Sequence, residues 1–265
     1  MNILYVGDVM AEPGIKVVEK LLPNIRRKYK VDLVIAQAEN LSDGKGVRVK
    51  DFRRLQAAGV DFCTGGNWSL HQEESIPLLN DPDEPIIRPA NYPDSMPGKG
   101  YKTVLVPEGK VLVVSLLGQI VGRDSGKPTA NPLKTIDEIL EIEKPSKYIA
   151  TVVNFHGDFS SEKKVIGYYL DSKVSAVIGD HWHIPTADAM VLPKGTAHIT
   201  DVGMCGSLDS SLGVEFSSII PRWLNSRPTR NVMEETGRMQ FNSVLIEIDP
   251  VTRLARSIIQ IQKVY

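Results

Sequence analysis

The sequence predicts an α/β fold with a mainly parallel sheet, and three observations lead to this prediction. Apolar runs typical of strands alternate with helical patterns through the N-terminal part of the chain, which is the spacing of βαβ units. The length of 265 residues suits one large α/β domain or two small ones, and no linker is seen along the chain. Polar side chains follow the ends of several predicted strands, as they do at the ligand sites of such sheets. We therefore expect residues 1–265 to form a single domain.

Three strands and two helices are predicted near the N-terminus. The strands cover residues 3–6, 32–36 and 60–63. A helix begins near Pro13, because proline suits the first turn of a helix and apolar residues follow at helical spacing. Pro23 should kink or divide this helix, since proline lacks the N–H that a helix interior needs. The second helix covers residues 50–58.

The remaining elements are less regular. Closely spaced prolines between residues 82 and 97 predict an ordered loop, and a polar loop is predicted over residues 123–131. Further strands are predicted over residues 101–106, 110–117, 148–154, 174–178, 243–249 and 254–262, and further helices over residues 132–143 and 160–170. The first two and the last two of these strands form hairpins, because short turns containing proline join them.

The composition excludes two classes of protein. There are 31 Lys and Arg against 32 Asp and Glu, a net charge of -1, whereas a protein with an extended nucleic-acid groove shows a cationic excess. Hydrophobic residues make up 42% of the chain, which is ordinary for a globular protein and too high for a disordered one. The sequence therefore predicts a globular protein without an extended nucleic-acid groove.

The cysteines and the N-terminus bear on the cellular compartment. Two cysteines, Cys63 and Cys205, cannot form a disulfide framework and fit a reducing environment. A signal peptide has basic residues ahead of its apolar run, and the N-terminal apolar run of this chain has none. No apolar stretch of the sequence is long enough to cross a bilayer. We therefore expect a cytoplasmic protein without a membrane partner. Whether it assembles as a homo-oligomer is left open.

The polar residues at the predicted strand ends share one chemistry. They are carboxylates, side-chain amides and imidazoles: Asp8, Glu39, Asn40, Asn67, His156, His181 and His183. Because the carboxyl ends of parallel strands meet at one edge of a sheet, we expect these side chains to converge. Nitrogen and oxygen ligands of this kind suit borderline divalent metals, and the absence of cysteine argues against a structural zinc site.

The number of candidate ligands favours two metal ions rather than one. Two ions that share a carboxylate activate water for attack on a phosphoryl group, and Glu39 is the natural bridge. Taken alone, Asp8 also fits a helix cap, and His156 also fits a buried core. Asn40 and Asn67 also fit turns, since asparagine tolerates left-handed backbone.

The two histidines near residue 180 are separated by one residue. Alternate residues of an extended segment point the same way, so His181 and His183 are predicted to face the metals together. By the same rule, Asp180 and Trp182 should point away from the metals and shape a pocket wall or an interface.

These motifs resemble the calcineurin-like metallophosphoesterases. The resemblance is carried by Gly7-Asp8, Glu39-Asn40, Gly66-Asn67, the segment from His156 to Lys163, and Gly179-x-His181-x-His183. Longer strings over residues 7–14, 88–93, 97–100 and 200–204 resemble the bacterial family of 2′,3′-cyclic-nucleotide 2′-phosphodiesterases more closely. The match extends over nearly the whole chain.

The resemblance implies a four-layer α/β/β/α sandwich and an enzyme that hydrolyses small cyclic nucleotides through a hydroxide bridging two metals. The metals implied are iron or manganese. One would be held by Asp8, Glu39, Asn40 and His183, and the other by Glu39, Asn67, His156 and His181.

This chain departs from the family at one position. Where the family has Gly-Asn-His, this chain has Gly66-Asn67-Trp68, and the missing histidine is thought to assist the leaving oxygen. An indole N–H donates a hydrogen bond but transfers no proton at neutral pH, and loss of a general acid costs about 10²–10⁴-fold in rate. His71 is a candidate replacement, although it also fits a surface position at a helix start.

Three cationic residues are candidates for phosphate contacts. They are Arg88, Lys45 and Lys99, although each also fits ordinary surface charge. The sequence therefore leaves three functions open: a phosphodiesterase, a metal-bearing nucleotide sensor in which Trp68 has disabled catalysis, and a hydrolase of some other ester or amide.

Overall fold

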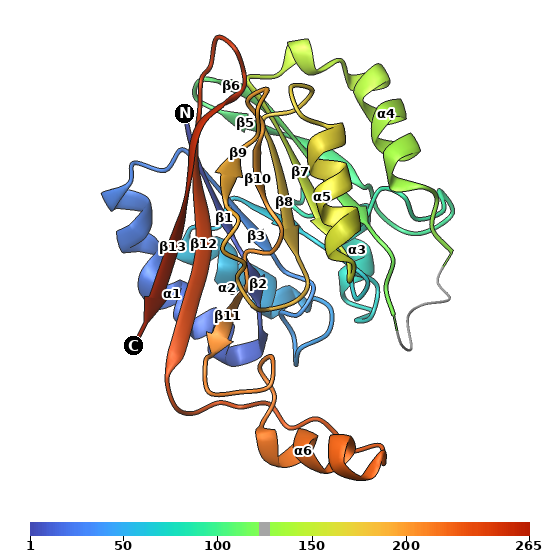
Figure 1. The fold of residues 1–265 in the computed structure, drawn as a ribbon, viewed down its shortest axis with the longest axis vertical. Coiled ribbons are helices and arrows are strands. Elements are labelled where there is room, and N and C mark those ends of the chain that lie inside the picture. Colours follow the sequence, from blue (N-terminus) through green and yellow to red (C-terminus); the bar gives the residue numbers. More distant parts are fainter. Residues whose placement is uncertain (122–127) are drawn as a thin grey trace.

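The chain forms two β-sheets that pack face to face, as the computed structural model of residues 1–121 and 128–265 shows (Figure 1). The first sheet has the strand order β2-β11-β12-β1-β3-β4, with β13 paired to β12. Its strands are β1 (Asn2–Val6), β2 (Asp8–Val9), β3 (Leu33–Gln37), β4 (Phe62–Thr64), β11 (Met204–Ser207), β12 (Met239–Ile248) and β13 (Ala255–Val264). The pairs β1–β3 and β3–β4 are parallel, so the predicted N-terminal βαβ units are confirmed.

The second sheet has the strand order β5-β6-β7-β8-β10-β9. Its strands are β5 (Tyr101–Val106), β6 (Gly109–Leu117), β7 (Ala150–His156), β8 (Ala176–Asp180), β9 (Met190–Val191) and β10 (Ala197–Ile199). The neighbours β6, β7, β8 and β10 are parallel, whereas both predicted hairpins are antiparallel. Each sheet is therefore mixed rather than simply parallel.

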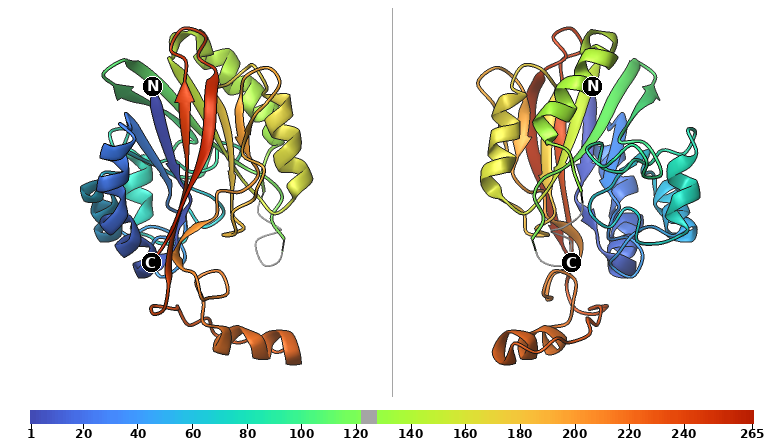
Figure 2. Two further views of the ribbon diagram at one scale, coloured as in Figure 1. Left: turned by 60° about the vertical axis from the view of Figure 1, so that its left-hand side comes forward. Right: turned by 90° about the vertical axis from the view of Figure 1, so that its right-hand side faces the viewer.

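Helices cover the outer faces of both sheets (Figure 2). The helices are α1 (Ala11–Lys28), α2 (Val49–Ala58), α3 (Ser75–Asn80), α4 (Pro132–Glu143), α5 (Ser160–Tyr169) and α6 (Phe216–Asn225), with a 3₁₀ turn, η2, at Pro145–Lys147. One core joins α1 and α2 to the first sheet, a second lies between the sheets, and a third joins α4 and α5 to the second sheet. The four-layer α/β/β/α sandwich is confirmed.

Of the two predicted effects of Pro23, division of the helix is wrong, because α1 continues through this proline. Interior proline removes one hydrogen bond and costs about 3 kcal/mol in a helix. Leu22 and Ile25 flank it and are buried in the core beneath α1, and burial of such side chains stabilises the helix by a comparable amount. The helix begins at Ala11, which places Pro13 inside its first turn.

The inner faces of the sheets turn polar at one end. Along β8, Ala176 and Ile178 lie in the core between the sheets, and Asp180 continues this alternation. Other inner-face positions at the same end are also polar: Tyr5 of β1, Gln37 of β3, and Asn154 and His156 of β7. The carboxyl ends of the parallel strands of both sheets therefore meet in a buried polar layer.

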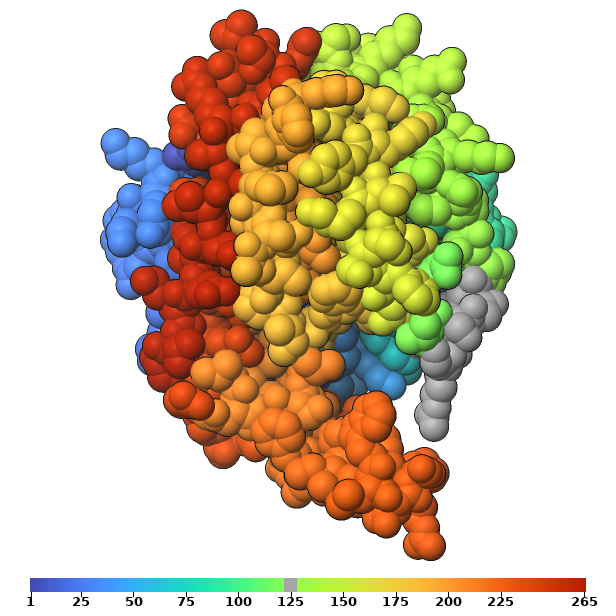
Figure 3. All heavy atoms as spheres, viewed as in Figure 1, coloured from blue at the N-terminus to red at the C-terminus, as the bar shows by residue number. Residues whose placement is uncertain are grey.

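An arm, residues 208–238, connects β11 to β12 and projects beyond the sandwich (Figure 3). Its helix, α6, has no counterpart among the predicted elements. Trp223 is 81% exposed and Leu224 is 76% exposed on this helix. The base of the arm contacts the rest of the chain where Leu212 O accepts a hydrogen bond from His183 Nδ1 at 3.2 Å.

Part of the predicted loop over residues 123–131 lies outside the described residues. No helix in the part of the chain that the structure describes is both long and apolar enough to cross a membrane.

Candidate metal centre

All seven predicted ligands lie at the edge where the carboxyl ends of the parallel strands meet. Asp8 lies in β2, Glu39 and Asn40 follow β3, and Asn67 follows β4. His156 ends β7, and His181 and His183 follow β8. The first four therefore come from the first sheet and the three histidines from the second, so the site lies where the two sheets meet.

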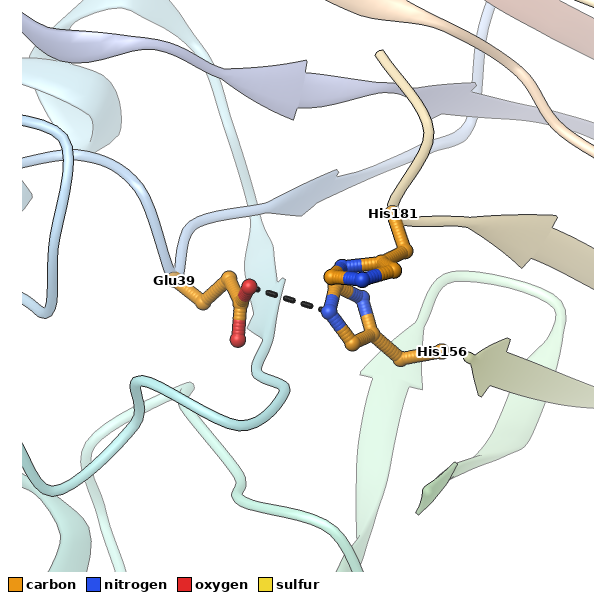
Figure 4. Close-up of side chains that lie close together, drawn as sticks. All are labelled: Glu39, His156 and His181. Atoms are coloured by element: carbon orange, nitrogen blue, oxygen red, sulfur yellow. Dashed lines mark ion pairs between the residues drawn. The ribbon is translucent and has the colours of Figure 1, made fainter. Parts of the chain in front are cut away.

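Four of these residues form one cluster, which we call the His156 group: Glu39, Asn67, His156 and His181. Glu39 Oε1 lies 2.9 Å from His156 Nε2, and Asn67 Oδ1 lies 3.1 Å from the same nitrogen. The rings of His156 and His181 meet at an angle of 64°, with their centroids 4.4 Å apart. Ligand atoms of Glu39, His156 and His181 all lie within 4.8 Å of one another (Figure 4), close enough to hold one metal ion.

The other three residues form the Asp8 group: Asp8, Asn40 and His183. His183 Nε2 lies 3.3 Å from Asn40 Oδ1 and 3.9 Å from Asp8 Oδ1. Asp8 Oδ2 accepts a hydrogen bond of 3.3 Å from the backbone N–H of His181, which links the two groups. The structure therefore places the seven candidate ligands in two neighbouring groups.

Charge is distributed unequally over the two groups. Burial alone lowers the pKa of His156, but the carboxylates of Glu39 and Asp180 outweigh it and raise this pKa well above 6.5. Burial alone raises the pKa of Glu39, but the charge and hydrogen bond of His156 outweigh it and lower this pKa. The two side chains therefore form a buried ion pair in which the imidazolium of His156 is the cation.

The Asp8 group has no such cation. Burial and the charge of Asp180 raise the pKa of Asp8 well above 3.8. Burial and the neighbouring His181 lower the pKa of His183 to about 4, so this imidazole is neutral. Asp8 Oδ1 is buried and has no hydrogen-bond partner among the described residues. A buried carboxylate oxygen beside a neutral imidazole and an amide oxygen fits a divalent cation, which binds such a donor set.

The prediction of an extended backbone through His181 and His183 is wrong. The φ angles are 106° at His181 and 62° at His183, so the chain bends in a left-handed conformation at both residues. The buried ammonium of Lys163 holds this bend: its Nζ donates to the backbone oxygen of Asp180 at 2.6 Å and to Asp201 Oδ2 at 2.9 Å. Asp201 Oδ2 also accepts a hydrogen bond of 2.8 Å from the backbone N–H of Trp182.

Asp180 does not point away from the site, so that prediction is also wrong. Its Oδ1 lies 2.7 Å from His156 Nδ1. Its Oδ2 accepts hydrogen bonds from Tyr5, Asn154 and Gln37 at 2.8, 2.5 and 3.2 Å. Asp180 therefore fixes the ring of His156 with Nε2 toward Glu39, as carboxylates do for metal-binding histidines. The alternation along β8 was the sequence signal that could have revealed it.

Trp182 and Asp158 lie around the second histidine of the His156 group. Asp158 Oδ1 lies 3.3 Å from His181 Nε2, and this contact is the main reason that the pKa of Asp158 is lowered. Trp182 Nε1 donates a hydrogen bond of 3.0 Å to the backbone oxygen of Asp158, and its ring lies 4.1 Å from Lys163 Nζ. Sequence reasoning did not single out Asp158.

Trp68 lies beside Glu39 and is partly exposed. Its backbone N–H donates a hydrogen bond of 2.9 Å to Glu39 Oε2. Lys45 Nζ lies 4.1 Å from the centre of the indole. His71 is exposed and meets the indole edge-on, with ring centroids 5.2 Å apart.

Arg88 and Lys99 lie apart from both groups. Arg88 is buried and donates hydrogen bonds to the backbone oxygens of Pro89, Pro97 and Met96 at 2.7, 3.3 and 3.4 Å. Both residues line a separate cavity of about 660 Å³ next to α4, whose lining contains no member of either group. The structure therefore does not bring Arg88 to the candidate metal centre.

Comparison with known proteins matches nearly the whole chain to one family. A family model described as YmdB-like protein matches residues 4–261. The 2′,3′-cyclic-nucleotide 2′-phosphodiesterase of Bacillus subtilis (strain 168) is 38% identical over 256 residues, which are 96% of this chain and 94% of that protein.

Two crystal structures superpose on the whole chain. A hypothetical protein from Thermus thermophilus is 38% identical with a TM-score of 0.91, covering 100% of this chain and 99% of its own. A novel phosphatase from Mycoplasma pneumoniae is 29% identical with a TM-score of 0.92, covering 100% and 93%. Because relatives over the whole length are a phosphodiesterase and a phosphatase, the prediction of a hydrolase is confirmed. The chain therefore belongs to the YmdB-like protein family.

Proposed function

We propose that this chain hydrolyses a phosphodiester bond of a small cyclic nucleotide with the help of two divalent metal ions. One observation carries the proposal: ligand atoms of Glu39, His156 and His181 lie within 4.8 Å of one another, and a buried oxygen of Asp8 accepts no hydrogen bond from the described residues. The name of the Bacillus subtilis relative supports the choice of a cyclic nucleotide.

The two groups of ligands correspond to two metal positions. Asp8, Glu39, Asn40 and His183 would hold one ion, and Glu39, Asn67, His156 and His181 the other. When bound, two such ions activate water and polarise the phosphoryl oxygens. We propose iron, with manganese as the alternative, because both accept mixed carboxylate, amide and imidazole ligands.

The protein's own contribution is to fix its ligands before substrate arrives. Asp180 holds the ring of His156 through Nδ1, which leaves Nε2 to face Glu39. Lys163 and Asp201 hold the bend that carries His181 and His183. Because these supports are buried, each ligand keeps its orientation without having to be reorganised during the reaction.

We also propose that residues 1–265 act as one cytoplasmic domain. Ligands from Asp8 to His183 come from both sheets, so neither sheet alone makes the site. Cys63 and Cys205 are unpaired and buried, which suits a reducing compartment.

The decisive experiment compares natural protein with Glu39→Ala, with exposed Glu108→Ala as the matched control. Purified protein is stripped of metal, reloaded with iron or manganese, and assayed on 2′,3′-cyclic AMP and on bis(p-nitrophenyl) phosphate. We expect turnover to require metal and Glu39→Ala to lower it by at least about 10³-fold, since a metal ion contributes several kcal/mol. Elemental analysis should show less bound metal in Glu39→Ala only.

Unchanged turnover by Glu39→Ala would contradict the proposal. Tight binding of the nucleotide by metal-loaded natural protein without any hydrolysis would instead identify a nucleotide sensor.

A further inference from the structure

Lys45 lies on the indole of Trp68, at the position where the resemblance implies a catalytic histidine. Its Nζ is 4.1 Å from the centre of the Trp68 ring, within the range of a cation–π interaction. Trp68 is itself fixed to the candidate metal centre, because its backbone N–H donates a hydrogen bond to Glu39 Oε2. The ammonium is therefore held over a surface that is anchored to the proposed bridging carboxylate.

The backbone around Lys45 is also tied to the candidate ligands on both sides. Gly44 O accepts a hydrogen bond of 2.9 Å from the side chain of Asn40, and Gly46 N donates one to the backbone oxygen of Glu39. Both glycines have φ of 79°, a left-handed conformation that favours glycine, and so the loop can turn back on these ligands. Gln72 Nε2 donates a further hydrogen bond of 3.0 Å to Lys45 O.

The charge of Lys45 is not neutralised within its loop. Asp43, the carboxylate nearest in sequence, forms its ion pair with Arg48 at 2.6 Å. Lys163, by contrast, is fully buried and forms an ion pair with Asp201 at 2.9 Å, so its charge is neutralised within the protein. Lys45 is half-buried and has no carboxylate within ion-pair distance among the described residues. The positive charge of Lys45 is therefore available to interact with a phosphate.

We propose that Lys45 donates the proton needed by the leaving oxygen, in the place where the family has a histidine and this chain has Trp68. The proposal rests on the proposed phosphodiesterase function. An ammonium group can give up a proton, whereas an indole N–H only donates a hydrogen bond. The alternative donor, His71, is exposed, and its ring meets the indole edge-on.

The proton balance of this step is simple. The oxygen of a water molecule bonds to phosphorus and loses one proton to solvent, while one P–O ester bond of the cyclic phosphate breaks. The electron pair of the broken bond stays on the ribose oxygen, which takes a proton from Lys45 Nζ. The neutral amine then regains a proton from solvent.

Substrates that differ in their leaving group provide the test. A ribose alkoxide needs a proton as it leaves, whereas p-nitrophenolate leaves as a stable anion. We expect Lys45→Met to lower turnover of 2′,3′-cyclic AMP by about 10²–10⁴-fold and to change turnover of bis(p-nitrophenyl) phosphate little. Lys50→Met, which removes an exposed lysine on α2, is the matched control and should leave both rates unchanged.

A second variant tests whether the loss is chemical rather than structural. In Lys45→Ala, added propylammonium should restore part of the turnover of 2′,3′-cyclic AMP, while metal content stays equal to that of natural protein. Equal losses on both substrates, undiminished turnover of the cyclic nucleotide, or no rescue by propylammonium would each overturn the role of Lys45. Natural metal-loaded protein that hydrolyses neither substrate would instead overturn the proposed function.

Discussion

The two groups of candidate ligands differ in how they manage charge without a metal. In the His156 group, Glu39 and Asp180 lie on opposite sides of a fully buried imidazole, at 2.9 and 2.7 Å, and hold it charged. In the Asp8 group, the imidazole of His183 is neutral and one oxygen of Asp8 has no hydrogen-bond partner among the described residues. One group supplies its own cation, and the other lacks one.

This difference predicts that a metal is accepted in two different ways. An ion entering the His156 group must displace the proton of His156, because a metal ligand must be deprotonated. An ion entering the Asp8 group supplies a charge that no described side chain provides. The His156 group should therefore contribute more to the stability of the metal-free protein than the Asp8 group does.

Replacing one histidine of each group should give the largest expected difference, measured as folding free energy of the metal-free protein. His156→Asn leaves the carboxylates of Glu39 and Asp180 buried without a cation, which should cost about 3–5 kcal/mol of folding free energy in metal-free protein. His183→Asn removes a neutral imidazole and should cost about 1 kcal/mol. Urea unfolding of chelator-treated protein measures both. Equal losses would show that the two groups do not differ in charge.

Asp180→Asn tests the His156 group through a residue that is not itself a candidate ligand. It keeps the shape of the side chain but removes the charge that holds His156 Nδ1, so metal affinity should fall about 10–100-fold. Titration calorimetry with manganese measures this affinity. Asp171→Asn is the matched control, because Asp171 is also buried but accepts hydrogen bonds from the backbone N–H groups of Lys194 and Thr196. A full loss of affinity in the control would contradict this assignment.

The stability of the metal-free protein should fall as the pH rises above 6.5. The raised pKa of His156 means that the folded state keeps a proton that the unfolded state has released, so this contribution is complete below 6.5 and is lost as the pH rises through the folded-state pKa. The raised pKa of Asp8 acts in the same direction, but its contribution begins to be lost once the pH rises above 3.8. His183 acts in the opposite direction, but only below 6.5.

The slope of stability against pH that His156 contributes can reach about 1.4 kcal/mol per pH unit. Urea unfolding at pH 6.5 and pH 8.5 measures it, and metal-loaded protein should not show it. The His156→Asn variant should show a smaller slope, and an unchanged slope in that variant would assign the effect to other groups.

His71→Ala should have the smallest effect. The side chain is exposed and touches only the edge of Trp68 among the ring contacts of the described residues, so stability should change by less than about 0.5 kcal/mol. Turnover of 2′,3′-cyclic AMP should stay unchanged. A tenfold loss of turnover would identify His71, rather than Lys45, as the proton donor.

The sequence predicted correctly that the candidate ligands lie at the ends of strands. The βαβ pattern and the polar residues at strand ends predicted which edge carries the site, because parallel strands must place their carboxyl ends together. All seven candidate ligands lie at that edge.

Backbone conformation and tertiary support were not predictable in the same way. The left-handed bend at His181 and His183 depends on Lys163 and Asp201, which are distant in sequence. Helix α6 was missed because Pro221 and two serines interrupt its helical pattern. The role of Asp180 was missed because the rule for extended chains was applied beyond the end of β8, where the backbone turns.

The bend at residues 181–183 has a consequence for hydrogen exchange. Its amides belong to no helix or strand, a condition that usually allows rapid exchange with solvent. Yet the N–H of Trp182 donates to Asp201, and Asp201 is paired with the fully buried ammonium of Lys163. Freeing this amide therefore uncovers a buried ion pair. We expect Trp182 to exchange as slowly as the core strands, so its rate reports how often the histidine-bearing bend opens.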